Sequence, residues 1–188
     1  MKIIENPLRK DWSKINQRPT QSVEDIETKV SSIFKEIQQF GDQSIQKYTL
    51  EFDKVLLDDL VLSSEEIEGA ALKVPDSLKE AIALAKNNIE KFHAAQKTES
   101  LQIETSRGVV CWQEKRPIEK VGLYIPGGTA PLFSTVLMLA VPAQIAGCKE
   151  IVLCSPPDAS GNINPITVYV ASLCGVTKIY KVGGIQAI

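Results

Sequence analysis

The sequence predicts an α/β protein in which a helix-rich region, residues 1–118, is joined to a parallel-sheet domain over residues 119–188. Apolar residues recur at helical spacing through most of the first region. After about residue 118 short apolar runs alternate with helical segments, in the order strand, helix, strand, helix, strand. Such alternation favours a parallel sheet, because parallel neighbours are joined by crossover helices.

The first two predicted helices cover residues 22–40 and 42–52. One face of the first is apolar, and its start can be capped by Ser22 with Asp25 nearby. Gly41 is a suitable stop, since glycine commonly ends helices. Residues 55–62 form a short apolar segment that fits either a strand or a loop. The next helix is expected to begin at Ser63 or Ser64, where Glu66 completes a capping pattern.

The clearest amphipathic helix is predicted from Pro75 to Gln96. Its apolar face consists of Leu78, Ile82, Ala85, Ile89 and Phe92. His93, the only histidine of the chain, falls near the end of this helix. It is interpreted as a positioned or solvent-facing histidine, with a catalytic role as the alternative.

A β-hairpin is predicted within residues 103–118. The turn falls at Arg107-Gly108, between segments rich in strand-forming residues. Trp112 is expected to lie in the core.

The parallel domain is predicted to contain three strands and two helices. The strands are expected at residues 120–125, 150–154 and 178–182, and the helices at 132–147 and 165–174. The first helix is apolar nearly all round, which predicts that it is buried, and Pro142 is expected to kink or split it.

Glycine turns follow two of these strands. Pro126, Gly127 and Gly128 come after the first strand, where they are expected to place free N–H groups at the start of the next helix. Such a helix start binds anions, most often phosphate. A second pair, Gly183-Gly184, follows the third strand and should lie at the same edge of the sheet. A glycine pair also fits a plain tight turn, and no G-x-G-x-x-G pattern is present.

Two further residues flank these turns. Tyr124 precedes the first turn and is placed to stack on a planar ring. Gln186 follows the second and offers an amide donor and acceptor.

Composition argues against several classes of function. The net charge is -2 without a cluster of Lys and Arg, which disfavours nucleic acid as a partner. No apolar run is long enough for a transmembrane helix, so no membrane partner is expected. The four cysteines form no C-x-x-C pair and are interpreted as free, mostly buried thiols in a reducing cytoplasm. One histidine makes a zinc site from this chain alone unexpected, and no catalytic triad or paired acid and base can be assembled.

At the first glycine turn the sequence resembles the histidinol dehydrogenase family. The similarity runs from Val121 through the turn to Ala140 and continues to Pro157. It ends with residues 182–188, where Ile185 stands in place of the usual alanine. Weaker matches upstream extend it over nearly the whole chain; they are Gly41-Asp42, Tyr48, Phe52-Asp53, Phe92-His93 and Gln96.

The resemblance implies an NAD-dependent, zinc-containing oxidoreductase of the cytoplasm, which acts as a homodimer. The family oxidises L-histidinol to L-histidine through the aldehyde with two NAD, at the end of histidine biosynthesis. Its NAD-binding domain is Rossmann-like. The resemblance places NAD contacts on Tyr124, Pro126 and Gln186, with Gly127 and Gly128 allowing the backbone to approach the cofactor.

Family members extend well beyond the position of Ile188. Their zinc ligands, their catalytic Glu-His pair and most histidinol contacts are expected there, so this chain is expected to hold no catalytic or metal-ligating residue. The resemblance therefore implies a truncated, N-terminal portion with a sheet incomplete at its C-terminus. Such a portion is expected to be inactive alone; the alternatives are a nucleotide-binding piece without catalysis and a purely structural one.

Overall fold

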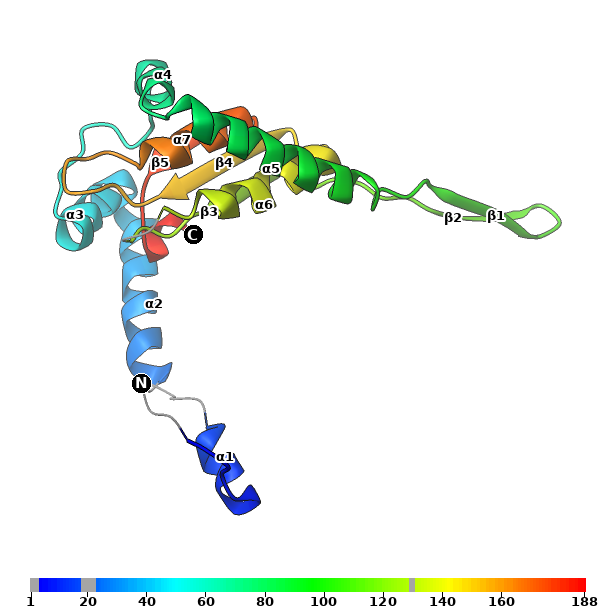
Figure 1. Cartoon of the computed structure of the whole chain (residues 1–188), viewed down its shortest axis with the longest axis horizontal. Helices are drawn as coiled ribbons and strands as arrows, with labels where there is room; N and C mark the ends of the chain where they lie inside the picture. The colour runs from blue at the N-terminus through cyan, green and yellow to red at the C-terminus, as the bar shows by residue number, and fades with distance from the viewer. Residues whose placement is uncertain (1–3, 18–22, 129–130) are drawn as a thin grey trace.

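The computed structural model of the chain describes residues 4–17, 23–128 and 131–188 (Figure 1). Seven α-helices lie in these ranges: α1 (Trp12–Ile15), α2 (Val23–Phe40), α3 (Asp42–Asp53), α4 (Ser64–Leu72), α5 (Asp76–Ala94), α6 (Phe133–Ala146) and α7 (Pro165–Leu173). The strands are β1 (Leu101–Ser106), β2 (Val109–Gln113), β3 (Lys120–Tyr124), β4 (Glu150–Ser155) and β5 (Lys178–Lys181). Two 3-10 turns, η1 (Arg9–Asp11) and η2 (Ile185–Ala187), complete the described elements. The proposed cap at Ser22 lies outside the described residues, and nothing is described of the Asp25 side chain.

The parallel sheet is confirmed. Its strand order is β3-β4-β5, and α6 and α7 are the two crossover connections. The segment left open between strand and loop forms one antiparallel bridge, Val61 to Tyr180, on the outer side of β5. The N–H of Leu62 donates to the Ile179 carbonyl at 2.9 Å, and the N–H of Lys181 donates to the Leu60 carbonyl at 2.7 Å. This segment therefore satisfies the backbone groups that β5 would otherwise leave unpaired.

The two faces of the sheet have different environments. Leu123, Leu153 and Ile179 share one face by register and are buried in the core with residues of α6 and α7. The other face carries Tyr124 and Cys154, which are only half-buried. The described helices therefore bury one face much more completely than the other.

Helices α4 and α5 pack against the crossover helices. They contact α7 and α6 respectively, and Ala70 and Ile82 belong to the same core as the sheet. Ser63 caps α4 as predicted: its hydroxyl accepts from the Glu66 N–H at 3.2 Å, while Glu66 accepts from the Ser63 N–H at 2.7 Å. The other Glu66 oxygen contacts Lys181 Nζ at 3.1 Å, which ties α4 to the end of β5.

Helix α6 differs from its prediction in two respects. It continues through Pro142 without a break, which excludes the split, while the alternative of a kink stays a prediction. Val136 and Ala140 are fully buried, but Met138 is 53% exposed and Leu139 is 39% exposed. One side of this apolar helix thus faces outward, because no described element covers it.

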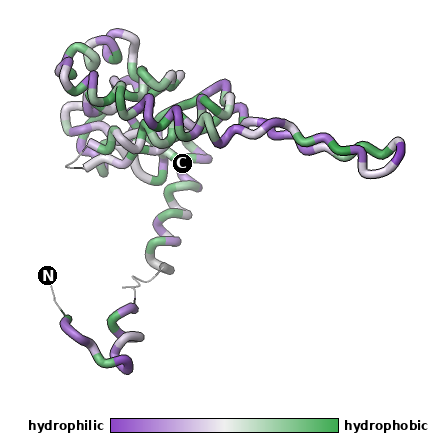
Figure 2. Tube along the Cα trace, turned by 45° about the vertical axis from the view of Figure 1, so that its right-hand side comes forward, coloured by the Kyte–Doolittle hydropathy of each residue, from purple (hydrophilic) through white to green (hydrophobic). Residues whose placement is uncertain are grey.

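The hairpin is confirmed, with its turn at Arg107-Gly108 and Gly108 at φ 84°. It extends from the body as an arm, with apolar residues along its length (Figures 1 and 2). Every residue of β1 and β2 is exposed, and Trp112 is 73% exposed, so its expected place in the core is wrong. The physical reason is that no described element forms a second layer over either face of the hairpin.

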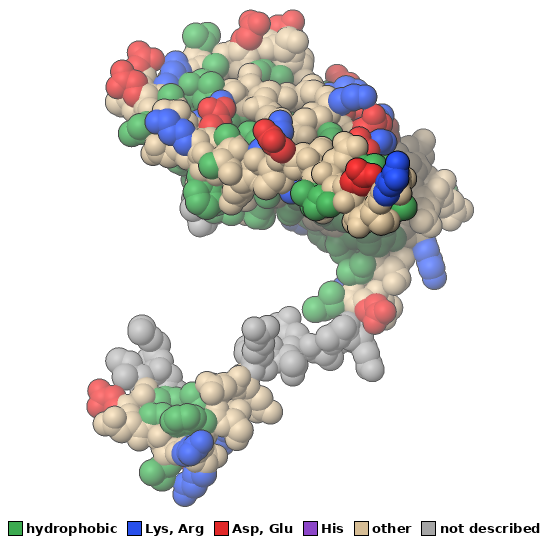
Figure 3. All heavy atoms as spheres, turned by 90° about the vertical axis from the view of Figure 1, so that its right-hand side faces the viewer, with side chains coloured by type: hydrophobic (Ala, Val, Ile, Leu, Met, Phe, Trp, Pro, Cys, Tyr) green, Lys and Arg blue, Asp and Glu red, His purple; other side chains and the backbone are tan. Residues whose placement is uncertain are grey.

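The surface seen from the hairpin side carries interspersed acidic and basic side chains (Figure 3). Within the described ranges, no helix combines the length and the apolar character needed to cross a membrane.

Candidate functional site

The two predicted glycine turns meet at the carboxyl edge of the sheet. The Gly184 N–H donates to the Tyr124 hydroxyl at 3.0 Å, joining the turn after β5 to the end of β3. This edge is where open α/β sheets bind their ligands. The structure therefore brings the two turns together as the sequence predicts.

Pro156 gives two of the glycines a packing role. A Cβ on Gly127 would lie 2.6 Å from Pro156 Cγ, and a Cβ on Gly183 would lie 2.4 Å from Pro156 Cβ. Both distances are far below van der Waals contact, so any larger residue would displace the proline ring. Gly128 differs, because its φ of 145° favours glycine while a Cβ there would meet nothing within 4 Å.

The glycine turn does not open the following helix, which corrects the prediction. Helix α6 begins at Phe133, and its N-cap Leu132 has a non-helical ψ of 46°. Gly127 and Gly128 therefore lie in a loop ahead of α6 rather than in its first turn.

A cavity of about 300 Å³ adjoins this loop. Pro126, Gly127 and Gly128 line it together with residues at the beginnings of α6 and α7. Two buried hydroxyl residues, Ser155 and Thr167, also line it. The sequence patterns did not single out either of these residues. The one available signal was Asn164-Pro165, which is typical of a helix start and so places Thr167 in the first turn of α7. Asn164 does cap this helix, since its side chain accepts from the Ile166 N–H at 3.0 Å.

Gln186 lies in a different cavity. It is 8% exposed, and neither its amide nitrogen nor its amide oxygen has a hydrogen-bond partner among the described residues. This second cavity, of about 410 Å³, is also lined by Asp58, Asp59 and Tyr180. The structure thus separates Gln186 from Pro126, Gly127 and Gly128, which line the first cavity.

A buried, unpartnered amide is unfavourable in the isolated chain. Its donor and acceptor are both available to a ligand, and a carboxamide or a ribose hydroxyl satisfies such a pair. The Gln186 amide is therefore a candidate ligand contact.

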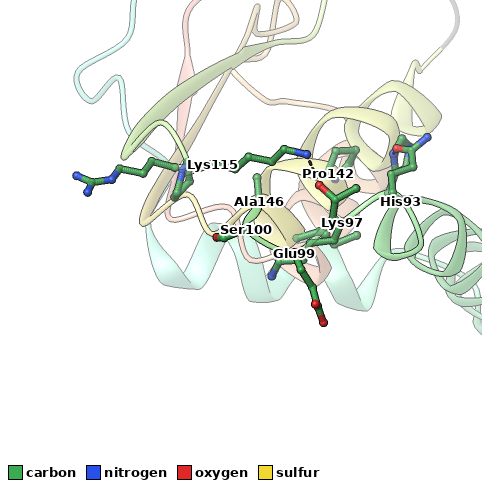
Figure 4. Close-up of a pocket in the computed structure, with 12 residues that line it drawn as sticks. His93, Lys97, Glu99, Ser100, Lys115, Pro142 and Ala146 are labelled. Carbon is green, nitrogen blue, oxygen red and sulfur yellow. Dashed lines mark hydrogen bonds between the residues drawn. The ribbon is translucent and has the colours of Figure 1, made fainter. Parts of the chain in front are cut away.

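A third cavity, of about 670 Å³, lies at the opposite edge of the sheet (Figure 4). It is bounded by the end of α5, the base of the hairpin and the last turns of α6, including Pro142 and Ala146. His93 Nδ1 is 2.9 Å from Gln96 Oε1, and Lys115 Nζ donates to Thr98 Oγ1 (dashed line in Figure 4). Four of the polar side chains here, those of His93, Gln96, Thr98 and Lys115, already have intramolecular partners, whereas the buried Gln186 amide has none, so the carboxyl edge is the stronger candidate.

All four cysteines are free, as predicted, but the expected burial of most of them is wrong: only Cys174 is buried, Cys148 and Cys154 are half-buried, and Cys111 is exposed. Burial raises the pKa of the Cys154 thiol, and it raises the pKa of Cys174 to about 11. These two thiols are therefore protonated and unreactive near neutral pH. No cluster of three or more His, Cys, Asp and Glu that could hold a metal exists within the described parts of the chain, so these residues do not fit a zinc ion.

Comparison with known proteins gives a consistent answer. The family model for histidinol dehydrogenase matches residues 16–188. A histidinol dehydrogenase of Bacteroides thetaiotaomicron is 53% identical over 188 residues, covering 100% of this chain and 44% of that protein. The enzyme of Pasteurella multocida is 52% identical over 186 residues, covering 94% of this chain and 42% of that protein.

A solved structure agrees with the sequence matches. The crystal structure of histidinol dehydrogenase from Elizabethkingia anophelis has a TM-score of 0.90 and 54% sequence identity, covering 97% of this chain and 42% of that one. The chain thus spans less than half the length of these relatives. The extent of the family match and the shared fold together show that the chain belongs to the histidinol dehydrogenase family.

Proposed function

We propose that this chain supplies the NAD-binding part of a histidinol dehydrogenase, the enzyme that oxidises L-histidinol to L-histidine through the aldehyde with two NAD. The observation that carries the proposal is the buried, unpartnered amide of Gln186. It lies two residues beyond Gly184, which is bonded to Tyr124 at the carboxyl edge of a parallel sheet. The β3-α6-β4-α7-β5 order is that of half a Rossmann-like domain.

Each predicted contact has a distinct role in this proposal. Gln186 orients the cofactor through its amide, and the Tyr124 ring supports a planar group of the cofactor. Pro126, Gly127 and Gly128 provide loop backbone along which the cofactor lies. When bound, NAD accepts the hydride released by the alcohol and then by the aldehyde.

The remaining parts of the enzyme complete the proposal. Residues 1–118 belong to a larger catalytic domain, and residues 119–188 begin the NAD-binding domain. The family resemblance supports a cytoplasmic homodimer with a zinc ion and a Glu-His acid-base pair. The described residues contain no cluster of three or more possible zinc ligands, so no step through zinc is assigned to this chain, and the 188 residues alone are expected to be inactive.

Calorimetric titration with NAD tests the binding role. Gln186→Met retains the side-chain volume but removes the amide, and we expect at least a tenfold loss of affinity, the equivalent of one hydrogen bond of about 1.4 kcal/mol. Gln102→Met on the exposed hairpin is the matched control and should leave binding unchanged. Equal affinity of the Gln186 variant and the wild type would contradict the assignment.

A separate assay tests catalysis. The wild-type chain is mixed with histidinol, NAD and zinc, and NADH formation is followed by absorbance. We expect no rate above a control without histidinol, and a clear rate would show that this chain holds the catalytic groups.

A further inference from the structure

The turn after β5 holds the Gln186 side chain in a buried position that its amide does not favour by itself. Gln186 is 8% exposed, and neither polar atom of its amide has a hydrogen-bond partner among the described residues. An amide that reaches water gains hydrogen bonds there, so burial without partners is unfavourable. The backbone of the turn must therefore hold this side chain in place.

Gly184 is the residue through which the turn is held. Its carbonyl accepts from the Ala187 N–H at 3.3 Å, which closes the 3-10 turn η2 around Gln186. Its N–H donates to the Tyr124 hydroxyl at 3.0 Å, which fixes the turn to the end of β3. Two hydrogen bonds thus connect Tyr124, through Gly184, to the turn that carries Gln186.

The Gln186 side chain also packs directly on Gly184. A Cβ on Gly184 would lie 2.7 Å from Gln186 Oε1 and 3.2 Å from Gln186 Nε2. Gly184 has a φ of 63° and a ψ of -159°, a combination that only glycine adopts readily. A shift of Gly184 would therefore move the surface against which the amide rests.

We propose that the Tyr124 hydroxyl is a positioning group, which acts through Gly184 to hold the Gln186 amide in the orientation that a ligand at the carboxyl edge meets. The inference rests on the proposed function in one respect, namely that this ligand is NAD. The two parts of Tyr124 then have separate roles, because the ring contacts the cofactor while the hydroxyl is engaged by the protein. Preformed geometry increases affinity, since the free chain does not spread the amide over other orientations.

The side-chain amide of Gln186 reports on this role without any ligand. Its protons can be identified in an NMR spectrum as the pair of signals that Gln186→Met removes. Tyr124→Phe removes the hydroxyl and retains the ring, and we expect exchange of these protons with solvent to become about tenfold faster as the turn opens.

Thr177→Val is the matched control for the loss of a hydroxyl. The Thr177 hydroxyl donates to the Ile151 carbonyl at 2.8 Å, at the amino end of β5 and so at the opposite edge of the sheet. This variant should lower the unfolding temperature, because it also loses one hydrogen bond. It should leave both the exchange of the Gln186 amide and the affinity for NAD unchanged.

Calorimetric titration with NAD measures the consequence at the proposed cofactor site. Tyr124→Phe should weaken NAD binding by about threefold to tenfold, the range expected for one hydrogen bond. In a Gln186→Met background the same substitution should change the affinity by less than about twofold, because no amide is left to position.

The outcomes separate this inference from the proposed function. An equal loss of NAD affinity on Tyr124→Phe in the wild-type and Gln186→Met backgrounds would overturn the inference, because the hydroxyl would then act on the cofactor directly. Unchanged exchange of the Gln186 amide in Tyr124→Phe would overturn it as well, whether or not NAD binds. Faster exchange in a chain that binds no NAD would support the positioning role and contradict the proposed function.

Discussion

Gly127→Ala should destabilise the fold because of Pro156, whether or not a ligand is present. The added Cβ would lie 2.6 Å from Pro156 Cγ, about 1 Å inside ordinary contact. Introducing one carbon into such a packed contact costs about 1–3 kcal/mol. Gly122→Ala is the control, because its Cβ would meet Val152 Cγ2 at 3.9 Å, an ordinary distance.

A second substitution, at Pro156, should relieve this clash. Pro156→Ala removes Cγ and leaves Cβ, which lies 3.6 Å from the position of the new methyl group on residue 127. The Gly127→Ala cost should therefore largely disappear when Pro156→Ala is also present, with a coupling energy of about 1–2 kcal/mol. Pro156→Ala should not relieve the destabilisation caused by Gly183→Ala, because the new Cβ at residue 183 would contact Pro156 Cβ at 2.4 Å and Cα at 3.1 Å, and both atoms remain in alanine.

Urea unfolding of the wild type, the single variants and the two double variants measures these terms through the transition midpoint. Strictly additive effects of Gly127→Ala and Pro156→Ala would refute the steric explanation. Wild-type stability of Gly127→Ala would refute it as well. The need for glycine at position 127 would then have to come from cofactor binding rather than from packing against Pro156.

The remaining predictions concern the cap of α4 and the buried thiol. Ser63→Ala should lower the free energy of unfolding by about 1 kcal/mol in urea, because it removes half of the capping box, and an unchanged midpoint would contradict that role. The hydrogen bond from the Ser63 N–H lowers the pKa of Glu66, so its stabilisation is present above pH 4.5 and is lost as pH falls further; Glu66→Gln should make the acid limb of the stability profile shallower. Cys174, with a pKa of about 11, should resist iodoacetamide at pH 8 in the folded chain while the exposed Cys111 reacts, as mass spectrometry would show; early modification of Cys174 would contradict its burial. Because unfolding releases that thiol to a lower pKa, stability should also fall between about pH 9 and 11, and Cys174→Ala should remove this loss.

Features set by local sequence were predicted well. The capping box at Ser63 and the turn at Gly108 depend on residues a few positions apart, and both are confirmed. The strand and helix alternation also follows from local periodicity. These features needed no knowledge of distant contacts.

Features that depend on distant contacts were not predictable in the same way. The exposure of Trp112 follows from the lack of a covering layer among the described residues, which no local pattern encodes. Pro156 contacts two glycines from separate turns, and only the folded sheet brings them together. The unpartnered amide of Gln186 likewise becomes visible only once burial and hydrogen bonds are known.

The antiparallel bridge between Val61 and Tyr180 has a consequence for synthesis of the chain. The nearby Glu66–Lys181 pair joins residues 115 positions apart, so this contact closes a long loop. Closing such a loop costs conformational entropy and slows folding. Domains can also fold during synthesis, beginning with the N-terminal part of the chain. Helix α4 can be capped early in translation, but it gains its tie to the sheet only after β5 has emerged from the exit tunnel. Helix α4 can therefore pack on α7 before β5 is synthesised, but its ion pair with Lys181 forms only afterwards.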